Sequence, residues 1–277
     1  HSSTGALEES KAKFVRPAEL GRYSQASELK LLDVCFGLGY NSASVMHALQ
    51  QTSPPRIVWW GLEVDPRPLQ WALSQQPFRD LWAGIVLQRF EQLHKSGSWC
   101  DAGGQGTMLW GDARQNLKGL PSSYQPDLIL MDAFSPGHCP QLWSEEFLGA
   151  LASRLAPGGR LLTYCRAAAV RSSLRRAGLR LRTLRPATRH RLEWSSGTLA
   201  VKPHSTDPLA MEGPGWTVLS PMEEEHLNTR ASVPYRDPES VDEPGMIHQR
   251  REREQQSCGL ESTSAWQRRW LMKKPSA

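Results

Sequence analysis

The sequence lacks several patterns that would assign it to common classes of protein. Its five cysteines lie far apart, without a C-x-x-C pair or a cysteine–histidine cluster, which argues against zinc-finger and disulfide-rich secreted folds. No apolar run approaches the length of a membrane span, and no signal-peptide pattern opens the chain. We therefore expect a cytoplasmic, monomeric protein with reduced thiols, no metal and no membrane contact.

Length and charge set wide limits on the fold and on the partner. The 277 residues can bury a full core in one medium domain with an appendage or in two small domains. The net charge of +5 and the isoelectric point near 9.1 are compatible with an anionic partner but do not establish one.

Apolar runs alternate with helical patterns from residue 29 to about 203. The strand-like runs cover 29–36, 56–64, 106–113, 126–134, 159–165, 179–187 and 196–203, and the helical patterns cover 42–51, 67–75, 78–94, 114–119, 143–155 and 167–177. Strands covered by helices on both faces read as continuous apolar runs, so we predict an α/β fold with a mostly parallel sheet. The last two runs have no helical pattern between them and are predicted to form an antiparallel hairpin. This arrangement resembles the Rossmann-like sheet of class I S-adenosylmethionine-dependent methyltransferases.

The chain divides into three predicted segments. Residues 1–28 are polar and irregular and are expected to line the active site, and residues 29–203 are expected to form a domain that resembles these methyltransferases. Residues 204–277 are rich in proline, glutamate and arginine, and either stay partly disordered or pack on the domain. The aromatic residues Trp216, Tyr235, Trp266 and Trp270 argue for some docking.

A glycine turn follows the first predicted strand, in "LLDVCFGLGYNSASV". Gly37 and Gly39 would let the backbone approach a ligand closely. Ser42 stands where a dinucleotide motif would have its third glycine, which counts against NAD.

Acidic residues end the next strands. Glu63 and Asp65 lie at the end of the second run and could hold a ribose diol, and Asp112 could accept from an adenine amino group. Each acid alone is more often a turn or cap residue, but three in order after a glycine turn favour a ligand site at the carboxyl edge of the sheet.

The fourth of these strands ends on Asp132 and continues into the loop "DAFSPGHCP". Asp132 either caps this loop or forms part of the wall between cofactor and substrate. Pro136 and Pro140 restrict the loop, and Phe134 offers a flat face for a base.

These residues resemble the MnmC-type methyltransferase family, the tRNA 5-methylaminomethyl-2-thiouridine methyltransferases. The family's D-x-F-x-P loop, followed by a proline and a Trp-Ser/Thr helix start, reads here "DAFSP…P..WSEEF". "HSSTGALEESKAKFV", "DVCFGLGYN", "PGGRLLTYCRAAAVRSSLRRAGL" and "RHRLEWSSGTLA" are similar to four further family segments, so the resemblance covers residues 1 to about 203. Asp33 replaces the family's glutamate and Cys35 replaces a glycine. We expect the stand-alone form of the family, without its flavin-binding oxidase domain.

The resemblance implies S-adenosyl-L-methionine as cofactor and the anticodon stem-loop of a tRNA as partner. The implied cofactor-binding residues are Asp33, Phe36, Gly37, Gly39, Asn41, Glu63, Asp112 and Ala113. The implied substrate or RNA contacts are Glu9, Ser10, Phe134, Ser135, Pro136, Arg166, Arg189 and Arg191.

The family reaction would methylate the amine of a 5-aminomethyl group on wobble uridine. Asp132 is the catalytic candidate, because a carboxylate can hold the amine and help to remove its proton. It could instead bind the ammonium of the cofactor's methionine. Phe134, or else Trp143 or Tyr164, could stack on the extruded base.

Residues 166–191 contain nine arginines and no acid. Such a run is usually a solvated face, but uncompensated guanidinium groups repel one another unless phosphates approach. We therefore favour tRNA contact, with "TRHR" at 188–191 as the best patch.

Other functions remain open at this point. A spermidine-synthase-like aminopropyltransferase would share the sheet, the strand-ending aspartate and the sulfonium donor, as would another class I methyltransferase acting on a small amine. An RNA-binding protein that has kept an inactive methyltransferase fold is the non-enzymatic alternative.

Overall fold

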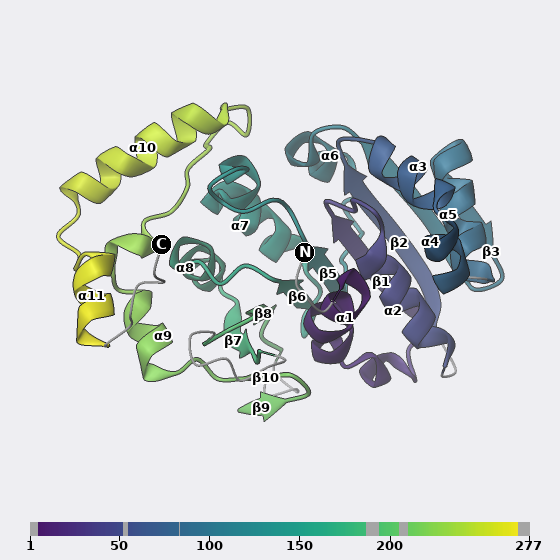
Figure 1. Cartoon of the computed structure of the whole chain (residues 1–277), viewed down its shortest axis with the longest axis horizontal. Helices are drawn as coiled ribbons and strands as arrows, with labels where there is room; N and C mark the ends of the chain where they lie inside the picture. Colours follow the sequence, from purple (N-terminus) through teal and green to yellow (C-terminus); the bar gives the residue numbers. More distant parts are fainter. Residues whose placement is uncertain (1–4, 52–54, 83, 187–193, 205–209, 271–277) are drawn as a thin grey trace. The chain divides into compact units, whose positions relative to one another are not determined.

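The structure is a computed structural model that describes residues 5–51, 55–82, 84–186, 194–204 and 210–270. The chain forms two compact units (Figure 1). The N-terminal unit comprises His1–Ala133 and Arg154–Thr163, and the C-terminal unit comprises Phe134–Ser153 and Tyr164–Ala277. The predicted segment boundaries at residues 28 and 203 are a different division and stay a prediction.

The N-terminal unit is built on a sheet of mostly parallel strands. Its strands are β1 (Glu28–Val34), β2 (Arg56–Glu63), β3 (Ser98–Asp101), β4 (Gly104–Trp110), β5 (Leu128–Met131) and β6 (Arg160–Thr163). They are ordered β3-β4-β2-β1-β5-β6, and only β3 runs antiparallel to its neighbour. The central strands are buried, as the continuous apolar runs predict: Leu31, Leu32 and Ile129 are fully inaccessible. The predicted mixed α/β sheet is confirmed.

The helices of this unit follow the predicted alternation with one error. They are α2 (Tyr40–Gln50), α3 (Arg67–Ser74), α4 (Gln76–Leu81), α5 (Ile85–Ser96) and α6 (Ala113–Gly119). The prediction of a single helix over 78–94 is wrong. The helix is interrupted near Gly84, whose φ is +87°, and two helices, α4 and α5, form instead. The short strand β3 was not predicted; Gly97, with φ +74°, ends α5 just before it.

The N-terminal segment was predicted to be irregular, but its described residues form a series of helical turns. It forms α1 (Ala6–Ser10), a π-helical turn (Lys11–Val15) and two 3₁₀ turns (Arg16–Ala18 and Leu20–Tyr23). Phe14 and Ala18 bury their side chains, which the polar composition of the segment concealed. The buried Arg160 of β6 donates to the Pro17 carbonyl at 2.6 Å and to the Glu19 carboxylate at 2.9 Å, so the segment is fixed to the sheet.

The C-terminal unit contains the predicted antiparallel hairpin. Strand β7 (Arg180–Leu184) pairs with β8 (Gly197–Val201), and β10 (Trp216–Thr217) joins β7 to β9 (Glu212–Gly213). Its helices are α7 (Glu145–Arg154), α8 (Ala168–Arg176), α9 (Pro221–His226), α10 (Pro244–Ser257) and α11 (Thr263–Arg269), the last three drawn in green to yellow in Figure 1. As predicted, Ser144 caps α7, since its Oγ accepts from the Phe147 amide at 3.2 Å.

The described residues from 210 onward pack within the C-terminal unit. The side chains of Trp216, Ile247 and Trp266 are almost inaccessible, Tyr235 is buried, and Trp270 lies more than a third exposed. The ring of His226 stacks on Trp266 with centroids 4.3 Å apart. None of the helices in the described part of the chain combines the length and apolar character that a membrane crossing requires.

Candidate active site

The carboxyl edge of the parallel strands gathers the predicted acidic residues of the N-terminal unit. Val34 of β1 aligns with Leu62 of β2 on one side and with Met131 of β5 on the other. Glu63 ends β2 and Asp132 follows β5. Because β2 and β5 are the two neighbours of β1, both residues lie at the same edge of the sheet. This is where ligands of open α/β sheets bind.

Glu63 joins the end of β2 to the glycine turn. Its Oε2 accepts from the Gly37 amide at 2.8 Å, and its Oε1 accepts from the amides of Val64 and Asp65 at 2.7 and 3.1 Å. Such charge-assisted bonds fix the carboxylate and hold the turn in place. Glu63 therefore has a structural role in the turn, whatever ligand it also contacts.

The two glycines of the turn have different surroundings. Gly37 has φ +58°, and a Cβ built on it would meet only the Cys35 carbonyl oxygen, at 3.9 Å. Gly39 has φ +85°, and its Cβ would overlap the rings of Phe90 at 2.4 Å and Phe36 at 2.6 Å. Gly37 thus leaves room for a ligand against the backbone, whereas Gly39 is required by packing within the protein. Phe36 itself packs edge-on against Trp59 and Phe90 in the core, so its side chain faces the protein interior.

Asp33 lies fully buried beneath this turn. Its Oδ2 accepts from Ser42 Oγ at 2.6 Å, and Ser42 in turn accepts from Trp59 Nε1 at 2.8 Å. Its Oδ1 has no hydrogen-bond partner among the described residues. Burial raises the pKa of Asp33 to about 7, helped by the negative charges of Asp132 and Glu63, so the carboxyl group takes up a proton near neutral pH.

Asp132 is partly buried and is held by α2. Its Oδ2 accepts from Asn41 Nδ2 at 2.7 Å, and its amide donates to the Val34 carbonyl at 3.1 Å. Burial, together with the negative charge of Glu9, raises the pKa of Asp132 to about 6, against the Asn41 hydrogen bond and the positive charge of Lys13. A carboxylate with a pKa near neutrality is suited to exchange a proton with a substrate.

Two of the predicted acids are engaged by neighbours in sequence. Asp112 caps α6 by accepting from the Arg114 amide at 2.8 Å, and its Oδ2 pairs with the Arg114 guanidinium at 2.7 Å. Burial opposes ionisation of Asp112, but the bonds from Arg114 outweigh it and lower the pKa. Asp65 pairs in the same way with Arg67 at 2.6 Å. Ala113 opens α6 and is almost inaccessible, so it offers mainly its backbone.

At the N-terminal helix, the predicted substrate-side residues Glu9 and Ser10 lie beside α2. Ser10 is buried and donates to the Tyr40 carbonyl at 3.2 Å, next to Asn41. Glu9 pairs with Lys13 one turn later at 2.5 Å. Lys13 was not among the predicted residues. The i, i+4 spacing from Glu9 was the sequence signal that could have revealed the pair.

The loop after Asp132 belongs to the C-terminal unit and presents one aromatic ring. Phe134 is 81% exposed, while its carbonyl accepts from Trp143 Nε1 at 2.7 Å. Ser135 makes a hydrogen bond with His138 Nδ1 at 2.9 Å, next to the partly exposed Pro136. Of the three proposed stacking residues, Trp143 is fully buried and is a core residue, Tyr164 is partly buried with its ring edge-on to Trp143, and Phe134 is the most exposed.

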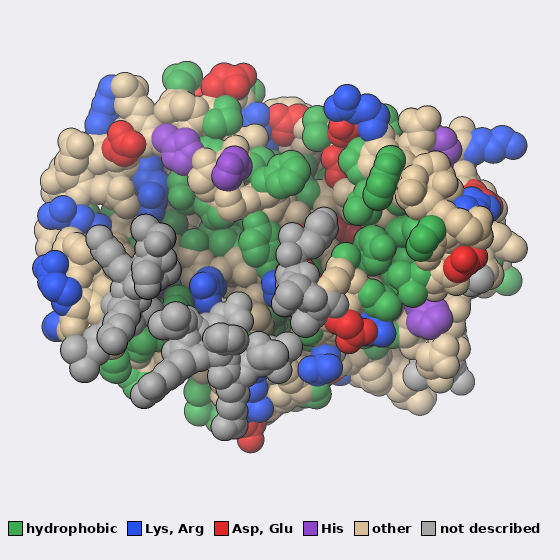
Figure 2. Space-filling view, in the orientation of Figure 1, with side chains coloured by type: hydrophobic (Ala, Val, Ile, Leu, Met, Phe, Trp, Pro, Cys, Tyr) green, Lys and Arg blue, Asp and Glu red, His purple; other side chains and the backbone are tan. Residues whose placement is uncertain are grey.

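Four of the seven described arginines of the run pair with acids from elsewhere in the chain, so the expectation that the run lacks counter-charges is wrong for these four. The pairs are Arg171–Glu223, Arg175–Glu224, Arg176–Glu145 and Arg185–Glu212. Arg166 donates to the Ser195 carbonyl at 2.8 Å and lies over the Trp194 ring. Arg189, Arg191 and the rest of "TRHR" lie outside the described residues. On the face in Figure 2, the described basic side chains lie in small separate groups, several beside acidic ones.

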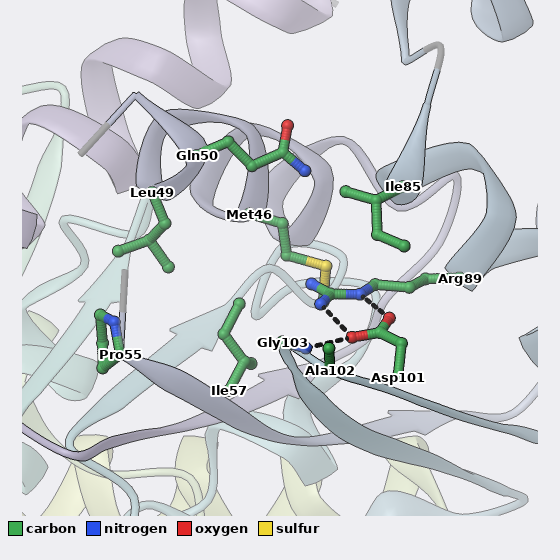
Figure 3. A pocket seen from close by; sticks show the side chains of 10 residues that line it. All are labelled: Met46, Leu49, Gln50, Pro55, Ile57, Ile85, Arg89, Asp101, Ala102 and Gly103. Carbon is green, nitrogen blue, oxygen red and sulfur yellow. Dashed lines mark hydrogen bonds and ion pairs between the residues drawn. The ribbon is translucent and has the colours of Figure 1, made fainter. Parts of the chain in front are cut away.

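A concave pocket lies at the opposite edge of the N-terminal unit's sheet, away from these acids (Figure 3). Ile57 and Gly103, at the amino ends of β2 and β4, line it together with Met46 and Leu49 of α2. Its polar end is the ion pair of Arg89 and Asp101, whose atoms lie 2.8 Å apart and satisfy each other. The pocket is therefore separate from the predicted ligand edge.

The described residues fit the sulfonium cofactor that the sequence predicts. The open space at Gly37 and the carboxyl groups of Glu63 and Asp132 at one sheet edge suit a positively charged ligand bound along the backbone.

Comparisons with known proteins identify the class. Residues 81–200 match a family described as S-adenosyl-L-methionine-dependent methyltransferase. The MnmC proteins of Delftia acidovorans and Caulobacter vibrioides, called tRNA 5-methylaminomethyl-2-thiouridine biosynthesis bifunctional proteins, are each 29% identical, over 69% and 77% of this chain. The crystal structure of MNMC2 from Aquifex aeolicus is 25% identical with a TM-score of 0.73, covering 93% of this chain and 78% of that one.

In fold and in its matches, the chain is similar to S-adenosyl-L-methionine-dependent methyltransferases, with S-adenosyl-L-methionine as cofactor. More particularly, the chain is similar to the methyltransferase part of the MnmC proteins. It spans 31% and 38% of the length of the two bifunctional relatives.

Proposed function

We propose that this chain methylates the primary amine of a 5-aminomethyl group on the wobble (2-thio)uridine of tRNA, giving 5-methylaminomethyl-uridine. The observation that carries the proposal is Asp132, in the D-x-F-x-P loop, held by Asn41 at the sheet edge with a pKa of about 6. The similarity to MnmC proteins, whose names state this modification, supports the same substrate class.

When bound, the cofactor supplies a methyl group already activated by its sulfonium, so the protein has mainly to align and deprotonate the amine. An alkylamine is largely protonated at neutral pH and cannot attack until it loses a proton. Asp132 is ionised above about pH 6 and can first attract the ammonium and then accept that proton. Fixing the two reactants in line corresponds to effective molarities of roughly 10⁵ M or more.

Three of the proposed RNA contacts lie in the loop after Asp132. The exposed ring of Phe134 is proposed to stack on the extruded base, with Ser135 and Pro136 holding the loop. Glu9 and Ser10 are proposed to line the substrate side, and Arg166, Arg189 and Arg191 to contact the phosphate backbone. The pairing of Arg175, Arg176 and Arg185 with acids restricts the proposed basic contacts to a smaller set.

The proposed cofactor contacts come from residues at the carboxyl edge of the parallel strands. Gly37 and Asn41 would lie against the cofactor's methionine part, and Glu63 near the ribose. Asp112 and Ala113 would lie near the adenine, with Gly39, Phe36 and Asp33 shaping the turn from behind.

The test is methyl transfer from labelled S-adenosyl-L-methionine to tRNA carrying 5-aminomethyl-uridine, with nucleosides analysed by mass spectrometry. We expect one added methyl on that nucleoside and none on tRNA whose wobble uridine is unmodified. Methyl transfer to putrescine instead of tRNA, or aminopropyl transfer to putrescine from the decarboxylated form of S-adenosyl-L-methionine, would refute the substrate assignment.

The variant Asp132→Asn separates the two roles of the carboxylate. As a base, its loss should lower turnover by about 10² to 10⁴-fold while calorimetry shows unchanged cofactor affinity. If cofactor affinity falls in parallel, Asp132 binds the methionine ammonium. Retained turnover removes Asp132 from the chemistry.

A further inference from the structure

The loop that follows Asp132 is largely exposed to solvent. Its exposed residues are Phe134, Ser135, Gly137 and His138. The ring of Phe134, which is 81% exposed, therefore gains little of its position from packing. A loop that becomes ordered only when its ligand binds loses conformational entropy at that moment, and this weakens binding. The contacts that hold the loop beforehand thus affect how well Phe134 can receive a base.

Two sets of contacts fix the start and the middle of the loop. The buried Trp143 donates from Nε1 to the Phe134 carbonyl at 2.7 Å. The amides of His138 and Cys139 both donate to the Ser135 carbonyl, at 2.8 and 2.9 Å, and close a tight turn. The tip of this turn is held from another part of the chain.

Helix α10 holds the tip of the loop. Nε2 of His248 lies 3.2 Å from the carbonyl oxygen of Gly137, a residue far away in the sequence. Because a carbonyl oxygen only accepts, the hydrogen lies on Nε2 and His248 is the donor. The imidazole packs edge-on against Tyr235, with ring centroids 5.8 Å apart and an interplanar angle of 82°. Ile247, the preceding residue of α10, is fully buried, so the helix is anchored next to His248.

The segment before α10 is attached to the chain just after the loop. The Tyr235 carbonyl accepts from the amide of Glu145, the first residue of α7, at 2.8 Å. The amide of the fully buried Asp237 donates to the Glu146 carboxylate at 2.8 Å. Between them, Arg236 pairs with Glu145 at 2.7 Å. Both the loop and the start of α7 are therefore bound by residues from 235 to 248.

We propose that His248 is a positioning residue that holds the loop after Asp132, so that the Phe134 ring is in place before a base arrives. The inference rests on the function proposed above and extends the acceptor side of the site to α10. His248 acts through the Gly137 carbonyl. The net contribution of one such hydrogen bond corresponds to a factor of about 2 to 10 in an equilibrium.

The alternative is that this hydrogen bond only stabilises the C-terminal unit. In that case its loss would lower the free energy of unfolding, measured by urea denaturation, without a selective change in the loop. The two possibilities also differ in whether the effect of His248 depends on Phe134. A structural effect adds to the loss of the Phe134 ring, whereas an effect that acts through the position of that ring disappears with it.

Hydrogen exchange measures the loop directly and independently of tRNA. His248→Phe removes the donor but keeps a ring against Tyr235, and His248→Gln keeps an N–H donor. In His248→Phe the amides of His138 and Cys139 should exchange about 2 to 10-fold faster, measured by mass spectrometry of peptides from the loop. His248→Gln should exchange at nearly the rate of the unaltered protein. Gln249→Ala, at the next and exposed position of α10, is the matched control and should leave the rate in place.

The kinetics of tRNA methylation give the second measurement. His248→Phe should raise KM for tRNA by about 2 to 10-fold, with kcat and the affinity for S-adenosyl-L-methionine unchanged. His248→Gln and Gln249→Ala should keep KM near that of the unaltered protein. In a Phe134→Ala background, His248→Phe should add no further rise in KM.

Equal exchange of the loop in His248→Phe and in the unaltered protein would overturn the inference. It would also be overturned by faster exchange with an unchanged KM, or by a rise in KM that is equally large in the Phe134→Ala background. If the unaltered protein does not methylate tRNA, the function proposed above fails, and the exchange rates decide by themselves whether His248 holds the loop.

Discussion

The two glycines of the turn after β1 should fail in different ways when replaced by alanine. At Gly39 the new Cβ would lie 2.4 Å from Phe90 Cε2 and 2.6 Å from Phe36 Cζ, distances that real Cβ atoms do not show. Both rings are buried and pack edge-on with centroids 5.2 Å apart, so neither can move without disturbing the other. At Gly37 the nearest atom would be 3.9 Å away.

The expected magnitudes follow from two effects. Both glycines have positive φ, and a left-handed conformation costs an alanine about 1 to 2 kcal/mol. Gly39→Ala adds overpacking, which typically costs about 1 to 3 kcal/mol, so its total is about 2 to 5 kcal/mol. Gly37→Ala should cost only the first contribution, about 1 to 2 kcal/mol.

The assay combines chemical denaturation with cofactor binding by calorimetry. Gly39→Ala should lower the free energy of unfolding most, and any loss of cofactor binding should follow the loss of fold. Gly37→Ala should remain folded but bind S-adenosyl-L-methionine more weakly, because the methyl group fills the space left against the backbone. If Gly37→Ala proves as destabilising as Gly39→Ala, or binds cofactor normally, the division of roles is refuted.

Three further predictions concern buried charge and pH. Arg171→Ala strands the buried Glu223 and should destabilise the protein by about 3 to 5 kcal/mol, whereas Arg175→Ala breaks an exposed pair and should cost about 1 kcal/mol or less, both measured by urea denaturation. Folding raises the pKa of Asp33 from 3.8 to about 7, so protonation of Asp33 stabilises the folded state at low pH, and this contribution is lost as pH rises from about 4 to 7. Asp33→Asn should flatten this decline of stability with pH, measured by thermal melts at a series of pH values. An unchanged slope would contradict the burial argument. For methylation of tRNA, kcat/KM should fall about tenfold per pH unit below about pH 6, where Asp132 becomes protonated, and a flat acid limb would count against its role as base.

Much of the fold could be predicted from the sequence because its signals are local. The continuous apolar runs specified the buried strands, and Ser144 with Glu145 and Glu146 specified the start of α7. The errors arose where one short signal competed with a longer one. Gly84 interrupts an amphipathic pattern that otherwise reads as one helix, and Phe14 supplies an apolar anchor within a polar segment.

The candidate site was predicted less completely, because its properties depend on contacts between residues distant in sequence. That Gly39 serves packing while Gly37 stays open depends on Phe90, some fifty residues later. That Arg171 is buried rather than available to RNA depends on Glu223, which the sequence places in a polar tail.

The sequence by itself determined which class of proteins this chain resembles, because the strand-ending acids, the glycine turn and the D-x-F-x-P loop are local patterns that can be recognised without the structure. Only the tertiary structure decided which of these groups are charged, buried or already paired. The reason is physical, since burial and neighbouring charges set the pKa of a carboxyl group, and both are produced by chain segments that meet only on folding. Asp33, Asp112 and Asp132 look alike in the sequence, yet folding raises the pKa of the first and third and lowers that of the second.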